Sequence, residues 1–204
     1  MDLVGPETLE DDLTPAARAA LLAARAEADA LRAELARLQR RLDEVELLAD
    51  RDPLTPVLNR RAFTRELHRT LAYCERYGTP ASLVFFDLDQ FKAVNDSFGH
   101  AAGDAVLQVV AQSLADHVRE SDLVGRLGGD EFAVILVQAN REAAETKAKD
   151  LQRRLEEHPV VFGPQSIPVR LSYGVRTFEQ GMEAAQMLAE ADAAMFMRKG
   201  ERRG

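Results

Sequence analysis

Apolar residues in the first quarter of the chain recur at alternating steps of four and three positions. This heptad pattern is typical of a helix that buries a narrow stripe against a partner helix. Thr14-Pro15 supplies a hydroxyl N-cap and a proline suited to the first helical turn. We therefore predict a helix over residues 14–50, roughly 50 Å long at 1.5 Å per residue. Its apolar positions are Ala17, Leu21, Ala24, Ala28, Leu31, Leu35, Leu38, Leu42, Val45 and Ala49.

Two interpretations of this helix are open. It could be a single amphipathic helix that lies on the rest of the chain. A parallel two-stranded coiled coil joining two copies of the chain is favoured, because so long and narrow a stripe has little else to cover it. Residues 1–13 are acidic and have no apolar period, so we expect a flexible tail before the helix.

The pattern changes after Asp52-Pro53, and residues 51–204 are predicted to form one globular domain. The order of its elements is βαββαβ with additions. This order indicates a ferredoxin-like α+β palm, in which an antiparallel sheet carries helices on one face, rather than a doubly wound parallel sheet. The predicted helices are 61–77, 103–118, 141–157 and 183–198. The predicted strands are 81–88, 123–127 and 132–137, followed by a β-rich stretch over 160–177 that turns at Gly163-Pro164.

The composition fits one domain with an appendage. The chain has 204 residues, 46% hydrophobic and 29% charged, so it is too short for two ordinary domains and too apolar for disorder. Its apolar runs, such as residues 132–137, are far shorter than the roughly 20 residues that span a bilayer. The acidic N-terminus does not resemble a secretory signal. Cys74 is a single cysteine and forms no internal disulfide, so we expect a cytoplasmic protein.

The net charge of −8 is unevenly distributed. Residues 1–50 contain 12 Asp and Glu against 6 Arg, so the rest of the chain is nearly neutral. A chain without a basic surface is not expected to bind nucleic acid or an anionic membrane. A phosphorylated small substrate is still compatible with this charge, because a metal ion held by carboxylates can neutralise phosphate locally.

Two acidic motifs fall at the ends of predicted strands. Asp87 ends an otherwise apolar strand, where a carboxylate is costly unless a cation meets it. Gly128-Gly129-Asp130-Glu131 joins two apolar strands and, taken alone, is typical of a hairpin turn. In a βαββαβ fold the first strand ends beside this hairpin, so Asp87, Asp130 and Glu131 could converge. Oxygen ligands alone favour Mg²⁺ or Mn²⁺ over zinc, which indicates phosphoryl or nucleotidyl transfer.

The segment from Asp89 to Asp104 is dense in polar side chains. Lys92 could contact phosphate, and Asn95 and Asp104 could bind a base edge. A carboxylate such as Asp104 accepts hydrogen bonds from the N1–H and exocyclic amine of guanine, whereas adenine offers neither donor there. Alternatively, Asn95 and Asp96 shape a turn and Asp104 lies in the first turn of a helix.

Several motifs follow one another in a fixed order and spacing. The pentapeptide Gly128-Gly129-Asp130-Glu131-Phe132 is preceded by D-x-D-x-F-K-x-x-N-D-x-x-G-H-x-x-G-D over residues 87–104. The domain opens with a segment that ends in Asn59-Arg60-Arg61-Ala62-Phe63, and weaker matches lie at Ser172-Tyr173-Gly174-Val175 and in residues 191–203. From Asp52 on, about three quarters of the chain resembles the GGDEF family of diguanylate cyclases.

The resemblance implies that the domain condenses two GTP molecules into cyclic di-GMP and two pyrophosphates. It implies two Mg²⁺ or Mn²⁺ ions in each active half-site, which would be held by Asp87, the Leu88 carbonyl, Asp130 and Glu131. Asp130, Glu131 and Lys92 would be the catalytic residues. The metal ions would lower the pKa of the attacking 3′-hydroxyl and stabilise charge on the α-phosphate.

The resemblance also assigns the substrate contacts. Asn95 and Asp104 would select guanine. The β- and γ-phosphates would meet Lys92, Lys199 and Arg203, together with backbone N–H groups at Gln90 and Phe91. Gly128 and Gly129 would let the nucleotide approach the hairpin backbone closely.

One half-site binds one GTP, so the resemblance implies a homodimer in which two domains face each other. The predicted heptad helix would hold these domains at high effective concentration. Arg119-Glu120-Ser121-Asp122 matches the R-x-x-D site at which cyclic di-GMP inhibits this family. An incidental Arg–Asp pair at a helix-to-strand corner is the alternative. Any other input would come through residues 1–50 or through an unidentified regulatory protein.

The chain departs from the family pattern in its opening segment, where Pro56-Val57 replaces Gly-Leu. Proline fixes φ and removes an N–H, so the joint between helix and domain is expected to be stiffer. Phe196 stands where the family often has tyrosine. Three other functions are open: a catalytically inactive module that binds GTP or cyclic di-GMP, a coiled-coil scaffold, and a cyclase with relaxed base choice.

Overall fold

The computed structural model describes residues 14–201, without the side chains of Arg40, residues 42–49 and Glu201. The predicted tail over residues 1–13 and the predicted phosphate contact of Arg203 lie outside the described residues. The chain divides into two compact units, residues 1–48 and 49–204, and each is described by itself. Between residues 14 and 201 no helix is long and apolar enough to cross a bilayer.

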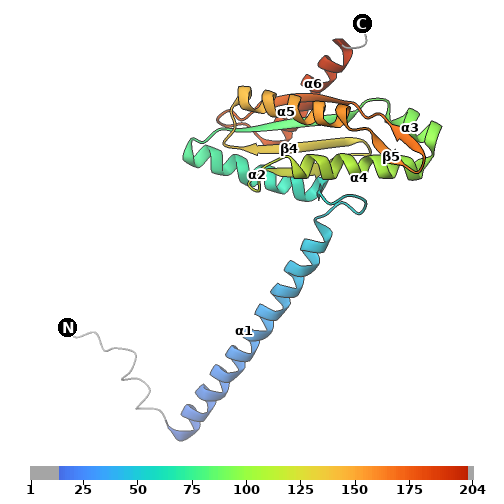
Figure 1. The fold of residues 1–204 in the computed structure, drawn as a ribbon. Coiled ribbons are helices and arrows are strands. Elements are labelled where there is room, and N and C mark those ends of the chain that lie inside the picture. The colour runs from blue at the N-terminus through green and yellow to red at the C-terminus, as the bar shows by residue number, and fades with distance from the viewer. Residues whose placement is uncertain (1–13, 202–204) are drawn as a thin grey trace. The chain divides into compact units, whose positions relative to one another are not determined.

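The described part of the first unit belongs to one helix, α1 (Pro15–Ala49), which is drawn in blue in Figure 1. Its start is capped as predicted, because Thr14 Oγ1 accepts a hydrogen bond from the backbone N–H of Ala17 at 3.3 Å. The continuous helix is therefore confirmed. Three described leucines of the heptad stripe, Leu31, Leu35 and Leu38, are exposed by 64%, 68% and 54% in the single chain, and Leu21 is half-buried.

The second unit is built on a five-stranded sheet (Figure 1). Its strands, in spatial order, are β1 (Leu58–Asn59), β3 (Leu123–Arg126), β4 (Glu131–Val137), β2 (Ala81–Leu88) and β7 (Leu171–Thr177). Neighbouring strands are antiparallel, except that β1 runs parallel to β3. Apart from the short β1, this is the predicted ferredoxin-like order. β5 (Val160–Phe162) and β6 (Gln165–Ile167) form a separate hairpin.

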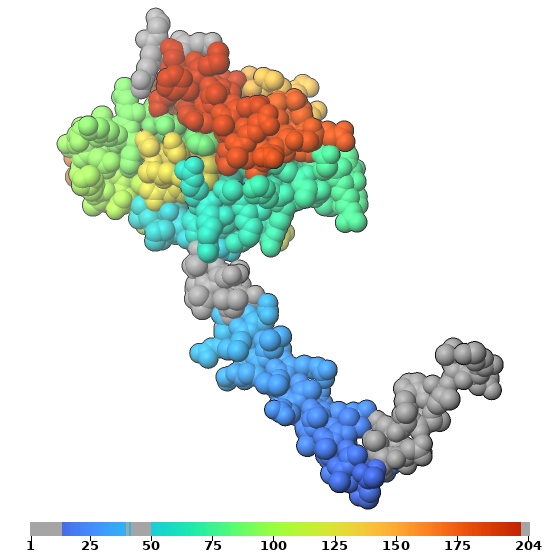
Figure 2. Space-filling model, turned by 180° about the vertical axis from the view of Figure 1, so that it is seen from behind, coloured from blue at the N-terminus to red at the C-terminus, as the bar shows by residue number. Residues whose placement is uncertain are grey.

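Helices cover both faces of the five-stranded sheet. α4 (His100–Asp116) and α5 (Arg141–Glu157) pack on the face of β2 that carries Val84 and Phe86. α2 (Arg60–Tyr77) and α6 (Ala184–Glu201) pack on the face that carries Leu83 and Phe85, and Figure 2 shows their teal and red surfaces next to each other. The expectation of helices on one face is therefore wrong. Because β2 is apolar at every position from Leu83 to Phe86, it needs cover on both sides.

The segment after β2 also differs from the prediction. Residues Phe91–Phe98 form a short helix, α3, where the sequence predicts only a polar segment that could turn. Gln90 precedes α3 with a left-handed backbone (φ 59°), and Gly99 follows it at φ 83°. Phe91 and Val94 pack against the core. Two apolar residues three positions apart are too short a pattern to predict a helix. The other predicted helices and strands are found within three residues of their expected ends.

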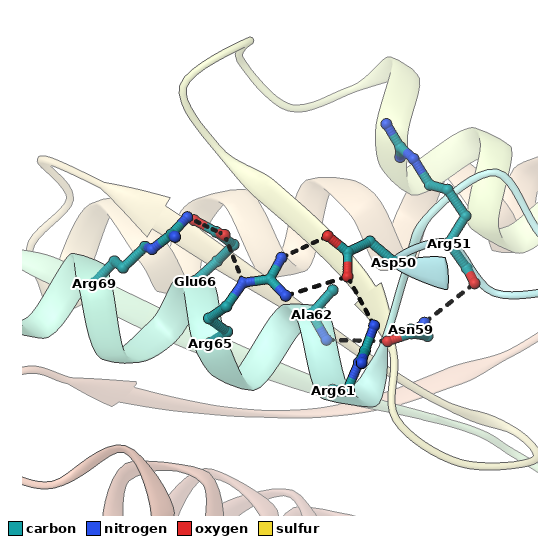
Figure 3. Close-up of polar contacts among 8 residues, drawn as sticks. All are labelled: Asp50, Arg51, Asn59, Arg61, Ala62, Arg65, Glu66 and Arg69. Atoms are coloured by element: carbon teal, nitrogen blue, oxygen red, sulfur yellow. Dashed lines mark hydrogen bonds and ion pairs between the residues drawn. The ribbon is translucent and has the colours of Figure 1, made fainter. Parts of the chain in front are cut away.

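Ion pairs hold the opening turn of the second unit to the rest of the domain (Figure 3). Asp50 pairs with Arg65 and Arg61 of α2, and hydrogen bonds from Arg65 above all keep the pKa of the Asp50 carboxyl below its usual value. Asp52 pairs with Arg126 of β3 at 3.1 Å, and both side chains are nearly buried. The start of the domain is thus fixed to α2 and to β3.

Gly174 of β7 lets α6 lie close to the sheet. A Cβ atom at Gly174 would lie 2.1 Å from the carbonyl oxygen of Ala191 and 2.3 Å from the backbone nitrogen of Met195. We expect Gly174→Ala to lower the free energy of unfolding by about 2 kcal/mol, because the helix would have to shift to admit the methyl group. Urea unfolding measures this change.

The matched control is Gly200→Ala near the end of α6, where a Cβ atom would meet open space. This variant should be as stable as the wild type or slightly more stable, since alanine favours helix over glycine. If Gly174→Ala unfolds at the same urea concentration as the control, the close approach of helix and strand is wrong.

Candidate functional site

The register of β2 and β4 brings the predicted acidic residues to one end of the sheet. Asp87 lies opposite Glu131, and the N–H of Leu88 donates to the carbonyl oxygen of Asp130 at 3.1 Å. Asp87 and Glu131 share the strand face of Phe85, which α2 and α6 cover. Residues more than forty positions apart in the chain therefore meet at the open end of this face.

Negative charge is crowded at this end of the sheet. Burial raises the pKa of Asp87, and the charges of Asp130 and Asp89 add to the increase, although Lys199 counteracts it. Burial also raises the pKa of Glu131, as do the charges of Asp192, Asp130 and Asp87. The ionised carboxylates are thus at a disadvantage here, and a positive charge would stabilise them.

Lys199 of α6 supplies one such charge. Its ammonium group forms a short ion pair with Asp87 and lies 3.5 Å from Asp89. Asp89 also accepts a hydrogen bond from the hydroxyl of Ser172 on β7 at 2.8 Å. The carboxylates of Asp87, Asp89, Asp130 and Glu131 are here called the acidic cluster. Lys199, which the sequence predicts to contact phosphate, thus neutralises part of this cluster.

The donor set at this site suits a hard divalent cation. The side chains of Asp87, Asp130 and Glu131 and the carbonyl of Leu88 are all oxygen ligands. Among the described residues, however, no three His, Cys, Asp or Glu side chains come close enough together to hold a metal ion. The backbone register thus brings these residues to one end of the sheet, and the Asp87 carboxylate is paired with Lys199 there.

Two arginines without a predicted role hold the hairpin between β3 and β4. Arg126 donates two hydrogen bonds to the carbonyl of Gly129, at 2.7 and 3.3 Å. Arg60 donates to the carbonyl of Leu127 at 3.0 Å. A Cβ atom at Gly128 would lie 2.4 Å from Oε2 of Glu131, whereas one at Gly129 would meet open space. Gly128 therefore makes room for a carboxylate of the site, and Gly129 leaves the hairpin surface open.

The residues predicted to bind guanine, Asn95 and Asp104, lie on α3 and α4, and these two helices contact each other. A Cβ atom at Gly103 would lie only 2.0 Å from Oδ1 of Asn95, so the Asn95 amide lies against the first turn of α4. Asp104 is the next residue of that turn and is exposed, and Lys92 is exposed on α3. The fold thus brings Asn95 near Asp104, with both groups accessible or half-buried.

A cleft of about 620 Å³ lies beside the acidic cluster. Gln90 and Lys199 of the predicted site line it, together with Asp89 and other residues to which the sequence assigned no role in the site. Its charged lining residues are the basic Lys199 and Arg170 and the acidic Asp89 and Glu156, so positive and negative groups line the cleft in equal number. The residues not predicted are Glu156, Pro168, Arg170 and Ser172, the last noted only within a family motif.

The R-x-x-D segment lies at the other end of the sheet. Asp122 is nearly buried, and its carboxylate accepts hydrogen bonds from the backbone N–H groups of Arg119 and Val137, each at 3.0 Å. Val137 pairs with Ala81, six residues before Asp87 on β2, so about 20 Å separates this segment from the acidic cluster. Asp122 shapes the backbone here, and Arg119 is exposed.

Glu131→Gln tests the crowding of charge. Because the folded protein raises the pKa of Glu131, the ionised side chain destabilises the fold above that pKa. Without divalent metal, we expect Glu131→Gln to unfold at a higher temperature than the wild type at pH 7. The difference should shrink as the pH falls through the raised pKa and vanish below about 4.5, the ordinary glutamate value.

Thermal unfolding in a chelating buffer between about pH 4 and pH 8 measures this difference. Glu120→Gln, at an exposed position far from the acidic cluster, is the control. A wild type that is more stable than Glu131→Gln at pH 7 would show that the carboxylate is not repelled.

Curated relatives match this domain. The diguanylate cyclase DosC of Escherichia coli strain K12 is 36% identical over 154 residues, which are 75% of this chain and 33% of DosC. The diguanylate cyclase TpbB of Pseudomonas aeruginosa is 35% identical over 178 residues, 86% of this chain and 41% of TpbB. The chain therefore spans about a third of the length of DosC and two fifths of TpbB.

Solved structures agree with the fold. The coiled coil and GGDEF domain of DgcB from Caulobacter crescentus, in complex with c-di-GMP, is 28% identical with a TM-score of 0.75, and the match covers 87% of this chain and 94% of that one. Diguanylate cyclase SiaD in complex with its activator SiaC, from Pseudomonas aeruginosa, is 31% identical with a TM-score of 0.73, over 96% and 76% of the two chains. The family described as "Diguanylate cyclase, GGDEF domain" matches residues 49–204, and the chain belongs to this family.

Proposed function

We propose that the protein is a diguanylate cyclase, which condenses two GTP molecules into cyclic di-GMP and two pyrophosphates. The observation that carries the proposal is the β2–β4 register, which places Asp87 opposite Glu131 and bonds Leu88 to Asp130. In the reaction the 3′-oxygen of one GTP bonds to the α-phosphorus of the other and pyrophosphate leaves. In a second step the 3′-oxygen of the other nucleotide bonds to the α-phosphorus of the first, the second pyrophosphate leaves, and the ring closes.

The acidic cluster would hold Mg²⁺ or Mn²⁺ through Asp87, the Leu88 carbonyl, Asp130 and Glu131. When bound, the metal supplies charge neutralisation at the α-phosphate and a lower pKa for the attacking hydroxyl. The raised pKa values of Asp87 and Glu131 support this assignment, because burial and neighbouring carboxylates disfavour the ionised side chains and a bound cation would offset both effects. Each half-site would hold two of these metal ions.

The protein's own groups would position the nucleotide. Asn95 and Asp104 would bind the guanine edge at the contact of α3 and α4. Lys199, and the backbone N–H groups after Gln90, would bind phosphate in the cleft beside Asp89. Lys92 is exposed on α3 and would contact the phosphates of the same nucleotide.

Each domain holds one half-site, so the reaction needs two domains face to face. The exposed leucine stripe of α1 supports a homodimer formed by a coiled coil. The similar DgcB structure likewise consists of a coiled coil and a GGDEF domain. Localisation in the cytoplasm is part of the same proposal.

Regulation is proposed at two levels. Product would bind at the exposed Arg119 with Asp122 holding the turn, and the similar DgcB protein was solved in complex with c-di-GMP. A partner protein could also act on the chain, as the activator SiaC is named for SiaD.

The direct test incubates the purified chain with GTP and Mg²⁺ and measures cyclic product by mass together with pyrophosphate. We expect Asp130→Asn to lower kcat by about a hundredfold, because a metal ligand that acts in the transition state is lost. Asp150→Asn, which removes only ion pairs within α5, is the control and should keep the activity.

The alternative to an enzyme is a catalytically inactive module that binds GTP or cyclic di-GMP. It would bind GTP without releasing pyrophosphate at any protein concentration. If the wild-type chain is folded and dimeric and gives that result, the cyclase hypothesis is contradicted and the binding-module hypothesis is supported.

Removal of residues 1–48 tests the tether. This boundary keeps Asp50 and its ion pairs within the domain. We expect turnover at low protein concentration to fall by about tenfold or more while GTP binding to each domain is kept, because the second half-site is no longer held nearby. Specific activity over a dilution series measures the effect, and identical curves for both chains would refute the tether.

A further inference from the structure

The last turn of α6 has no apolar anchor among the described residues. The apolar stripe that packs this helix onto the sheet ends at Met195. The next two residues, Phe196 and Met197, are 73% and 70% exposed. Lys199 lies in this turn and pairs with Asp87 of the acidic cluster. Some contact other than apolar packing must therefore fix the direction of Lys199.

Arg198 makes that contact. Its guanidinium carbon lies 4.2 Å from the centre of the Tyr173 ring, a distance typical of a cation–π interaction. The same group donates to both carboxylate oxygens of Glu145, at 3.1 and 3.2 Å. It also donates to the Tyr173 carbonyl, and the Tyr173 hydroxyl donates to Glu145, each at 3.4 Å. Arg198, Tyr173 and Glu145, here called the edge clamp, thus contact one another.

The edge clamp joins elements on opposite faces of the sheet. Arg198 belongs to α6 and Glu145 to α5, and these helices cover different faces. Tyr173 lies on β7, which is the last strand of the five-stranded sheet. The guanidinium therefore passes around the edge of the sheet. It ties the end of α6 to a helix that its own apolar stripe does not touch.

The geometry of a helix links the edge clamp to the acidic cluster. Successive side chains on a helix point about 100° apart, so fixing Arg198 on one side also fixes the direction of Lys199. The Lys199–Asp87 pair is mostly buried, with 19% and 17% of the side chains exposed. Such a pair needs a fixed geometry, because its attraction must exceed the loss of side-chain freedom and of hydration.

We propose that Arg198 is a positioning residue, which acts with Glu145 and Tyr173 to hold the last turn of α6 so that Lys199 reaches the acidic cluster. Arg198 itself touches no substrate. The inference rests on the proposed function only where it concerns GTP. For the protein without metal or nucleotide, we infer that the edge clamp controls the ion pair between Lys199 and Asp87.

The first test measures how fast the Lys199 amine reacts with an acylating reagent in the full chain, without metal or nucleotide. Mass spectrometry of the labelled peptide gives the rate. We expect Arg198→Met and Glu145→Gln each to raise the rate by about fivefold, which corresponds to about 1 kcal/mol lost from the Lys199–Asp87 pair when it is loosened rather than broken. Arg198→Lys, which keeps a charge near Glu145, should give a smaller increase.

Arg69→Met is the matched control, because Arg69 pairs only with Glu66 on α2 in the described contacts. It should leave the Lys199 rate unchanged. Thermal unfolding checks that each variant is folded, and Glu145→Gln keeps the test valid if Arg198→Met does not fold. A Lys199 rate equal to that of the control in Glu145→Gln and in each folded Arg198 variant would overturn the proposal.

The second test uses GTP. If Lys199 binds phosphate, loss of the edge clamp should raise the KM for GTP by about fivefold and change kcat much less, because ground-state and transition-state binding weaken together. A wild type that makes no cyclic product would contradict the proposed function but not the labelling result. An unchanged KM together with an unchanged labelling rate would contradict the edge clamp itself.

Discussion

The ion pair between Lys199 and Asp87 is the contact on which the arrangement of the site depends. The pairing of β2 with β4 forces carboxylates together at one end of the sheet, where burial and mutual repulsion raise the pKa values of Asp87 and Glu131. Only a cation offsets that cost, and in this structure the cation comes from α6. The site is therefore built around a deficit of positive charge, which a metal ion or a cationic side chain can fill.

Several elements of the domain keep this crowded end rigid. Arg126 bonds to the Gly129 carbonyl and to Asp52 at the same time, so the hairpin and the opening turn share one anchor. Gly174 lets α6 approach β7, and Arg198 extends the contact of this helix around the sheet edge. Preorganisation of this kind lowers the reorganisation that charge neutralisation would otherwise require.

The two ends of the sheet use carboxylates in different ways. At one end, burial and neighbouring carboxylates raise the pKa values of Asp87 and Glu131, and Asp87 is paired with the cationic side chain of Lys199. At the other end, both oxygens of Asp122 accept backbone N–H groups, which satisfies a nearly buried carboxylate without any ligand. An Arg–Asp motif can therefore have a structural aspartate even where its arginine is free to meet a ligand on the surface.

The sequence by itself determined most of the elements and the neighbourhood of the site. The heptad stripe predicts α1, the apolar runs predict β2 and β4, and the βαββαβ order places Asp87 beside the hairpin, because these features depend on local periodicity and simple topology. Tertiary structure decided which groups pair: Lys199 with Asp87, Arg126 with Asp52, and Arg198 with Glu145. It also decided that helices cover both faces and that α3 forms. Such contacts join side chains from distant segments and have no local period, so they arise only when packing fixes the distance between them.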